Sequence, residues 1–125
     1  MPRFLLDTHV WLWWLESRRI SVQAQQILDD VTSDLMVSVA SVWELSIKEM
    51  KGRFRAPNNL LECTLASGFG ILPIRWEHAR RTVFLPNHHG DPFDRLIVAQ
   101  AFEEDRVVIT RDERIGEYGI PVVPA

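Results

Sequence analysis

Short apolar runs and longer amphipathic segments alternate along this chain. Runs this short and rich in Leu, Ile and Val are typical of strands buried on both faces. They predict strands at residues 3–6, 35–37, 71–74, 106–110 and 121–123. Apolar residues at helical spacing predict helices at residues 9–15, 21–31, 39–51, 57–67, 76–84 and 92–104, with a short helix after Asp112. The alternation predicts an α/β fold, a single three-layer α/β/α domain over residues 1–125 with a mostly parallel, four- to five-stranded central sheet.

Capping and turn-forming residues define several element ends. Ser21 is a favourable helix cap. The inner side of the helix after it is predicted to comprise Val22, Ala24, Ile27, Leu28 and Val31. Pro57 is expected to open a later helix, which Gly68 and Gly70 then end. Because proline has no N–H to donate, Pro73 suggests that strand 71–74 lies near a sheet edge.

Acidic residues from distant parts of the sequence are predicted to meet at one edge of the sheet. Asp7 and Asp112 each follow a buried strand, and Glu44 lies early in the helix after the second strand. Asp94 is in the first turn of a helix that runs antiparallel to the strands, so its N-terminus lies at their carboxyl ends. Sites in open parallel sheets form at this edge.

Each acid also has a purely structural interpretation. Asp7 and Asp112 stand where helix caps are expected. Glu44 could complete a capping box with Ser41, and Asp94 could be an acid favoured by the helix dipole. Together, however, crowded carboxylates repel one another and raise one another's pKa. One or two divalent cations would relieve this repulsion, and oxygen ligands suit Mg²⁺ or Mn²⁺ better than Zn²⁺.

Composition narrows the class of protein. The chain has 125 residues, 46% of them hydrophobic and 25% charged, which fits one globular domain. One cysteine, Cys63, excludes an internal disulfide and suits a reducing cytosol. The apolar run at residues 4–15 is too short for a membrane span and has no cleavage site, so a cytoplasmic protein without membrane contact is expected.

Charge argues against a nucleic-acid binder that works by bulk attraction, because the formal net charge is -3. The cations are nevertheless clustered, in one group of Lys48, Lys51, Arg53 and Arg55 and another of Arg75, Arg80 and Arg81. Such clusters are either solvated surface or local contacts for phosphates.

Aromatic residues are dense after the first strand, where Trp11, Trp13 and Trp14 alternate with leucines. Leu12 and Leu15 add to this surface, which exceeds what one core face needs. Part of it is predicted to form an interface with another chain, together with helix 39–51. The alternative is that all five side chains pack in the core.

At this point the motifs carry a resemblance. The segments LLDTHVWLWWL, SVASVWELSIKEMKGR, HGDPFDRLIVAQA and VVITRDERIGEYGIPVVPA resemble the PIN-domain (PilT N-terminus) family, and more narrowly its VapC-type toxins. The resemblance implies a metal-dependent endoribonuclease toxin that cuts RNA at a site of Asp7, Glu44, Asp94 and Asp112. It also implies Thr8 and Thr110 as nearby hydroxyls, a small antitoxin as partner, and a homodimer.

The third acid of this family pattern could be Asp91 or Asp94. The pattern of an acid, two residues, then Ile and a small residue fits the run that starts at Asp94, which leaves Asp91 as the cap of the helix opened by Pro92. The cations expected to contact RNA are Lys48, Lys51, Arg53, Arg95 and Arg111. His9, His88 and His89 fall outside the motif, either as exposed residues or as substrate contacts.

Other functions remain open from the sequence. The same acids would serve a DNA nuclease or an RNA-processing enzyme without an antitoxin. A non-enzymatic module, such as a phosphate-receiving receiver domain, shares the fold class. A receiver needs paired acids after its first strand and a lysine after its last core strand. This chain has Asp7-Thr8 at the first place, and its lysines are Lys48 and Lys51, which weighs against a receiver.

Overall fold

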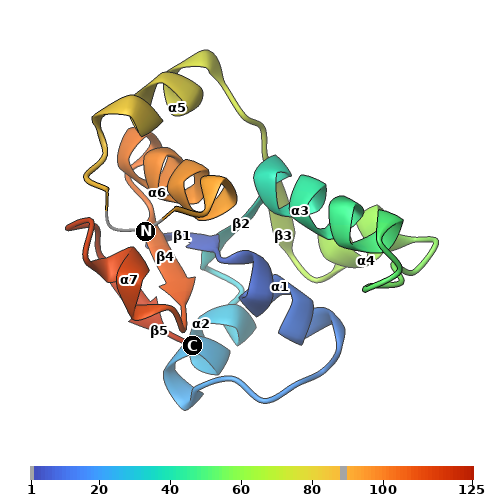
Figure 1. The fold of residues 1–125 in the computed structure, drawn as a ribbon. Coiled ribbons are helices and arrows are strands. Elements are labelled where there is room, and N and C mark those ends of the chain that lie inside the picture. Colours follow the sequence, from blue (N-terminus) through green and yellow to red (C-terminus); the bar gives the residue numbers. More distant parts are fainter. Residues whose placement is uncertain (1, 88–89) are drawn as a thin grey trace.

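The computed structural model of the chain describes residues 2–87 and 90–125. Within them, five parallel strands form one sheet in the order β3-β2-β1-β4-β5 (Figure 1). The central strand β1 (Arg3–Leu6) pairs with β2 (Asp34–Ser38) and β4 (Val107–Thr110), whereas β3 (Phe69–Leu72) and β5 (Val122–Pro124) form the edges. The predicted α/β fold with its parallel sheet is confirmed.

Helices cover both faces of the sheet and give the molecule its three layers (Figure 1). They are α1 (Thr8–Leu15), α2 (Val22–Asp29), α3 (Val39–Met50), α4 (Leu60–Ala66), α5 (Trp76–Arg81), the 3-10 turn η1 (Thr82–Phe84), α6 (Pro92–Glu104) and α7 (Glu113–Gly116). In the described ranges, no helix is both long and apolar enough to cross a membrane.

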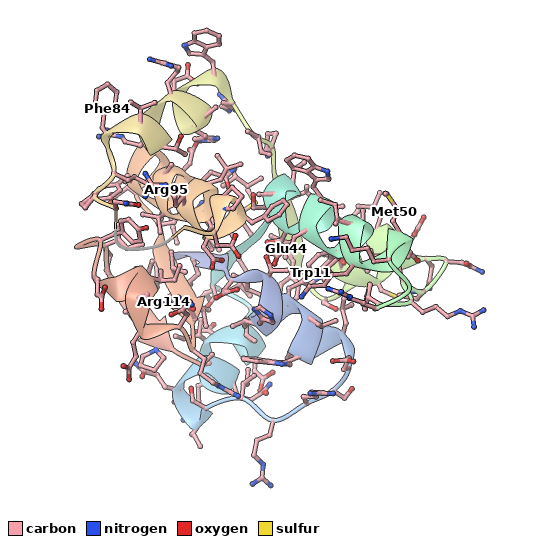
Figure 2. All side chains as sticks on the ribbon, in the orientation of Figure 1. Trp11, Glu44, Met50, Phe84, Arg95 and Arg114 are labelled. Carbon is pink, nitrogen blue, oxygen red and sulfur yellow. The ribbon has the colours of Figure 1, made fainter. Side chains whose placement is uncertain are left out.

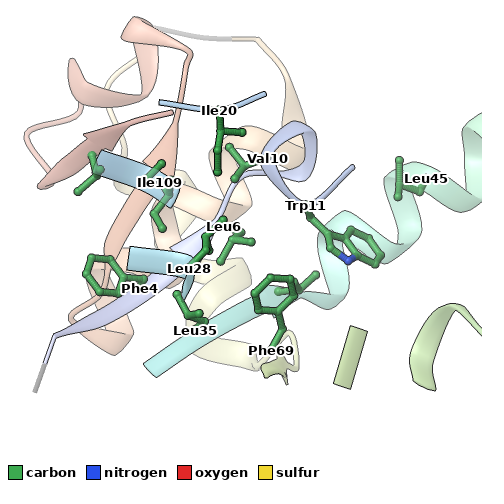
Figure 3. Close-up of a cluster of buried hydrophobic side chains, with 13 residues drawn as sticks. Phe4, Leu6, Val10, Trp11, Ile20, Leu28, Leu35, Leu45, Phe69 and Ile109 are labelled. Carbon is green, nitrogen blue, oxygen red and sulfur yellow. The ribbon is translucent and has the colours of Figure 1, made fainter. Parts of the chain in front are cut away.

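Alternate residues of β1 point into two hydrophobic cores, one on each face of the sheet. Leu6 packs with Trp11 of α1 and other residues in the first core (Figure 3). Leu5 points the other way and packs with Ile97 of α6 in the second core. Because both faces are covered, successive residues of the strand are apolar rather than alternately polar.

The tryptophans of α1 are buried or half-buried against other parts of the same chain. Trp11 is 1% exposed, and its Nε1–H donates a hydrogen bond of 3.2 Å to Thr64 Oγ1. Trp14 packs edge-on against Phe69 with ring centroids 5.7 Å apart, and both Trp13 and Trp14 are half-buried. Trp11 therefore belongs to the core, which leaves the half-buried residues of α1 as the part of this surface to which the predicted interface applies.

Two helices differ from their predicted extents. Val22 and Val31, predicted to face inward, are 75% and 98% exposed. The cause is that α2 starts at Val22 on its outer side and ends before Val31, with Asp30 as its C-cap. Helix α4 begins at Leu60 rather than at Pro57, since Pro57 forms only a turn whose carbonyl accepts a hydrogen bond from the Leu60 N–H.

The following strand is also displaced from its prediction. It covers Phe69–Leu72, so Gly70 lies within β3 instead of ending the preceding helix. Gly68, with a φ of 88°, supplies the left-handed turn that ends α4. Strand β3 lies at a sheet edge, as the presence of Pro73 predicts.

A buried polar chain fixes the start of α3 against α6. Ser38 caps α3 by accepting from the Ala40 N–H, and its hydroxyl donates to Gln100 Oε1 on α6 at 2.5 Å. Farther along, His78 of α5 and Glu104 of α6 share a hydrogen bond of 2.8 Å. Because His78 Nδ1 accepts from the Arg75 N–H, its Nε2 carries the proton that is donated to Glu104.

Candidate functional site

Asp7 lies at the end of the central strand and is 4% exposed. Its Oδ1 accepts from the His9 N–H at 3.1 Å and caps α1, while its Oδ2 accepts from the Thr110 hydroxyl at 2.6 Å. Burial acts to raise the pKa of Asp7, but the hydrogen bonds from His9 and Thr110 outweigh it and hold the pKa below its ordinary value. Asp7 is therefore a buried carboxylate that stays ionised.

The two predicted hydroxyls connect the acids to the scaffold. Thr110 also accepts from the Asp112 N–H at 3.0 Å, so it links the ends of β1 and β4. Thr8 donates a buried hydrogen bond of 2.8 Å to Ser41 on α3. This bond fixes α3 to α1 in the turn before Glu44. Ser41 is thus not the cap of a capping box, since the helix begins earlier, at Ser38.

Glu44 reaches from α3 toward the space between α1 and α6 (Figure 2). Its Oε1 is buried and has no hydrogen-bond partner in the part of the chain that the structure describes. Such an unsatisfied oxygen costs free energy and calls for a ligand, an ion or water, to complete it.

Asp94 shows that the acids lie within electrostatic reach of one another. Burial, the largest cause, and then the charges of Asp7, Asp91, Glu44 and Asp112 together raise the pKa of Asp94 to about 7. The topology thus brings together the four acids predicted for one edge of the sheet. Asp91 has the predicted capping role, because its Oδ1 accepts from the N–H groups of Phe93 and Asp94.

Asp112 caps α7 and also forms an ion pair with Arg114. Its Oδ1 accepts from the Arg114 N–H at 3.0 Å. The Arg114 guanidinium spans the carboxylate, with Nε at 3.2 Å from Oδ1 and Nη2 at 3.2 Å from Oδ2. Arg114 was not predicted from the sequence. The signal that could have found it is a base two residues after a helix cap, in reach of the capping carboxylate.

The donor set fits a hard divalent cation. In residues 2–87 and 90–125, no three His, Cys, Asp or Glu side chains stand close enough to bind one ion together. Mg²⁺ needs only one or two direct carboxylates, because it keeps several of its own waters. The unsatisfied oxygen of Glu44 and the raised pKa of Asp94 indicate that added positive charge would be stabilising at the rim, the edge formed by Asp7, Glu44, Asp94 and Asp112.

The predicted cations divide into two groups. Arg95 donates hydrogen bonds to the backbone carbonyls of Thr82, Leu85 and Pro86. Arg111 donates to the carbonyls of Arg19 and Ala125, and its Cζ atom lies 4.0 Å from the centre of the Trp13 ring. Both therefore have structural partners. Lys51 and Arg53 are exposed beyond the end of α3, and Lys48 is half-buried on that helix.

One of the histidines left open by the sequence lies beside the acids. His9 Nδ1 is 3.7 Å from Asp7 Oδ1, and the hydrogen bonding to this carboxylate raises the pKa of His9. His88 and His89 fall outside the described residues.

Comparisons with known proteins agree with this geometry. Residues 4–121 match the PIN domain family. Ribonuclease VapC22 of Mycobacterium tuberculosis (strain ATCC 25618 / H37Rv) is 33% identical, over 97% of this chain and 95% of that protein. The DNA-bound VapBC structure from Salmonella typhimurium matches with a TM-score of 0.72 at 20% identity, covering 99% of this chain and 98% of the other. VapBC2 from Rickettsia felis, also bound to DNA, matches with a TM-score of 0.70 at 12% identity, covering 98% of each chain. The chain belongs to the PIN-domain family, in its VapC-type branch.

Proposed function

We propose that this protein is a metal-dependent endoribonuclease and the toxin of a toxin–antitoxin pair. The observation that carries the proposal is the acidic rim of Asp7, Glu44, Asp94 and Asp112, where burial and mutual repulsion raise the pKa of Asp94 to about 7. The ribonuclease relative supports RNA as the substrate. The relatives solved as VapBC complexes support an antitoxin as the partner.

The rim residues would divide the chemistry among them. A bound Mg²⁺ or Mn²⁺ supplies an activated water and offsets the charge that develops on the phosphate. One or two of Asp7, Glu44 and Asp94 would hold it directly and the others through its bound waters, with the Asp7 carboxylate kept ionised by hydrogen bonds from His9 and Thr110. One of the rim carboxylates would also accept the proton of the attacking water.

Cations outside the rim would hold the flanking phosphates. Lys48, in the last turn of the helix that carries Glu44, and Lys51 and Arg53, which follow the end of that helix, are assigned this role. Arg95 and Arg111 are assigned to bracing the loops beside the site, because their guanidinium groups donate to backbone carbonyls.

Asp94→Asn is expected to lower the rate of Mg²⁺- or Mn²⁺-dependent RNA cleavage by about 100-fold or more, the scale for losing one group that stabilises the transition state. Asp91→Asn is the matched control. Asparagine caps helices about as well as aspartate, so this variant should lose less than about 10-fold. The measurement is single-turnover cleavage with metal and with a chelator. A larger loss for Asp91→Asn, or equal cleavage with the chelator, would contradict the proposed site.

We assign the antitoxin to the groove between α1, the α3–α4 connection and α4. The groove has a volume of about 760 Å³ and is lined by Trp14, Phe54, Pro57 and Cys63, among others. These side chains offer apolar and aromatic surface of the kind enriched at interface centres. The homodimer implied by the sequence stays a prediction.

Trp14→Ala is expected to weaken binding of the antitoxin, the product of a neighbouring reading frame, by more than about 1 kcal/mol. Isothermal calorimetry measures the affinity, and circular dichroism checks folding because Trp14 also packs on Phe69. Trp76→Ala, which removes a 78% exposed tryptophan from α5, is the control. If Trp14→Ala does not fold, Cys63→Trp should block the groove instead. Equal affinities for these variants and the control would rule out this groove.

A further inference from the structure

An exposed aromatic pair lies beside the acidic rim. Trp43 of α3 packs edge-on against Phe93 of α6, with ring centroids 5.3 Å apart and planes at 76°. Trp43 is nevertheless 58% exposed, although burying such a large ring would be favourable. The contact with Phe93 therefore orients the indole without covering it.

Each of these aromatic residues directly precedes a rim acid in the sequence. Trp43 precedes Glu44, and Phe93 precedes Asp94, so each pair of Cα atoms is about 3.8 Å apart. The N-terminal halves of α3 and α6 lie side by side at the carboxyl edge of the sheet (Figure 1). The aromatic pair thus forms a wall beside the acids, on the same two helices that carry Glu44 and Asp94.

We propose that Trp43, oriented by Phe93, stacks on a nucleobase of the RNA next to the phosphodiester bond that is cut. This inference rests on the proposed ribonuclease function. A nucleotide's base is attached through one sugar to its phosphate, and Trp43 and Phe93 are each the direct chain neighbour of a rim acid. Exposed aromatic rings are the usual platforms for the bases of single-stranded RNA.

The surroundings favour RNA over a protein partner at this wall. Lys48 lies four residues after Glu44, one helical turn away, and can contact a neighbouring phosphate. The exposed Trp76 lies away from the acids, in a hollow that Glu77, Arg80, Arg81, Phe84 and Glu103 also line and that none of the four rim acids lines. Trp76→Ala is therefore a matched control for the loss of an exposed tryptophan.

The test combines protein variants with abasic RNA. Wild-type protein, Trp43→Ala, Trp43→Phe and Trp76→Ala are compared on one RNA substrate, and on the same RNA with a single abasic residue on either side of the cut. Trp43→Ala should weaken RNA binding and lower kcat/KM by about 10-fold or more, mainly through KM. Trp43→Phe should restore part of the loss, and Trp76→Ala should match wild type.

The decisive result is the double-mutant cycle between ring and base. On RNA lacking the stacked base, Trp43→Ala should cost little, because its partner is already absent. Additive losses, or none, overturn the inference even if wild type cleaves RNA well. The inference is also overturned if Trp43→Ala changes the oligomeric state, measured as molar mass in solution, but leaves the RNA affinity unchanged. Trp43 and Phe93 would then form a protein interface. Wild-type protein that neither binds nor cleaves RNA overturns the proposed function, and this inference with it.

Discussion

Replacing Asp7 with asparagine is expected to reduce RNA cleavage by at least about 100- to 1000-fold while the chain still folds. Asparagine keeps the side-chain oxygen that accepts from the His9 N–H, so the cap of α1 survives. The Thr110 hydroxyl can turn and accept from the new amide in place of donating to the carboxylate. What is lost is the negative charge at the centre of the rim.

Cleavage and folding must be measured on the same samples. Single-turnover rates in Mg²⁺ or Mn²⁺ give the chemical defect, and urea unfolding gives the stability. Thr110→Val serves as a second variant, because it removes the hydrogen bond to Asp7 and leaves the charge. It should cost clearly less activity than Asp7→Asn. Wild-type cleavage by Asp7→Asn would remove Asp7 from the catalytic site.

The metal-free protein is expected to lose stability as the pH rises from about 4 to about 7. The ordinary pKa of an aspartate is 3.8, whereas that of Asp94 in the folded protein is about 7. Between these values the folded state keeps a proton that the unfolded state has released, so raising the pH favours unfolding. Asp7 acts in the opposite sense in a separate window, below 3.8, because its pKa is lowered by folding.

Divalent ions should reverse the loss. A metal that binds only the folded state at 100 times its Kd adds about 2.7 kcal/mol, which should raise the melting temperature by more than about 5 °C. The metal also competes with the proton on Asp94, so its apparent affinity should increase up to about pH 8. Thermal unfolding across pH, with and without Mn²⁺, tests both points. In Asp94→Asn the slope between pH 4 and 7 should flatten, and an unchanged slope would assign it to another group.

The sequence predicted the fold and the gathering of the acids because both follow from the parallel topology. Once strands and helices alternate, Asp7, Glu44 and Asp112 must follow parallel strands at one edge, and Asp94 must begin a returning helix there. The cap at Asp91 was predictable for a local reason, since a capping acid followed by Pro92 is a strong helix start.

Other features depend on where side chains point, which a one-dimensional pattern does not contain. Arg95 reads as a surface cation, yet the η1 turn brings backbone carbonyls to its guanidinium. Ser41 reads as a cap, yet Ser38 takes that role and leaves Ser41 to bond Thr8. The unsatisfied oxygen of Glu44 depends on how that side chain is buried in the folded chain, so no spacing rule would reveal it.

The helix caps at the rim determine which of its acids would persist in a related protein that has lost its nuclease activity. Asp7, Asp91 and Asp112 each hold the first turn of a helix, so they serve the fold as well as the site. A descendant that had abandoned nuclease activity would still be under pressure to keep an aspartate, asparagine or serine at these positions. Glu44 and Asp94 cap nothing, and would be free to drift. In a pseudoenzyme of this lineage, these two positions would reveal the lost activity first.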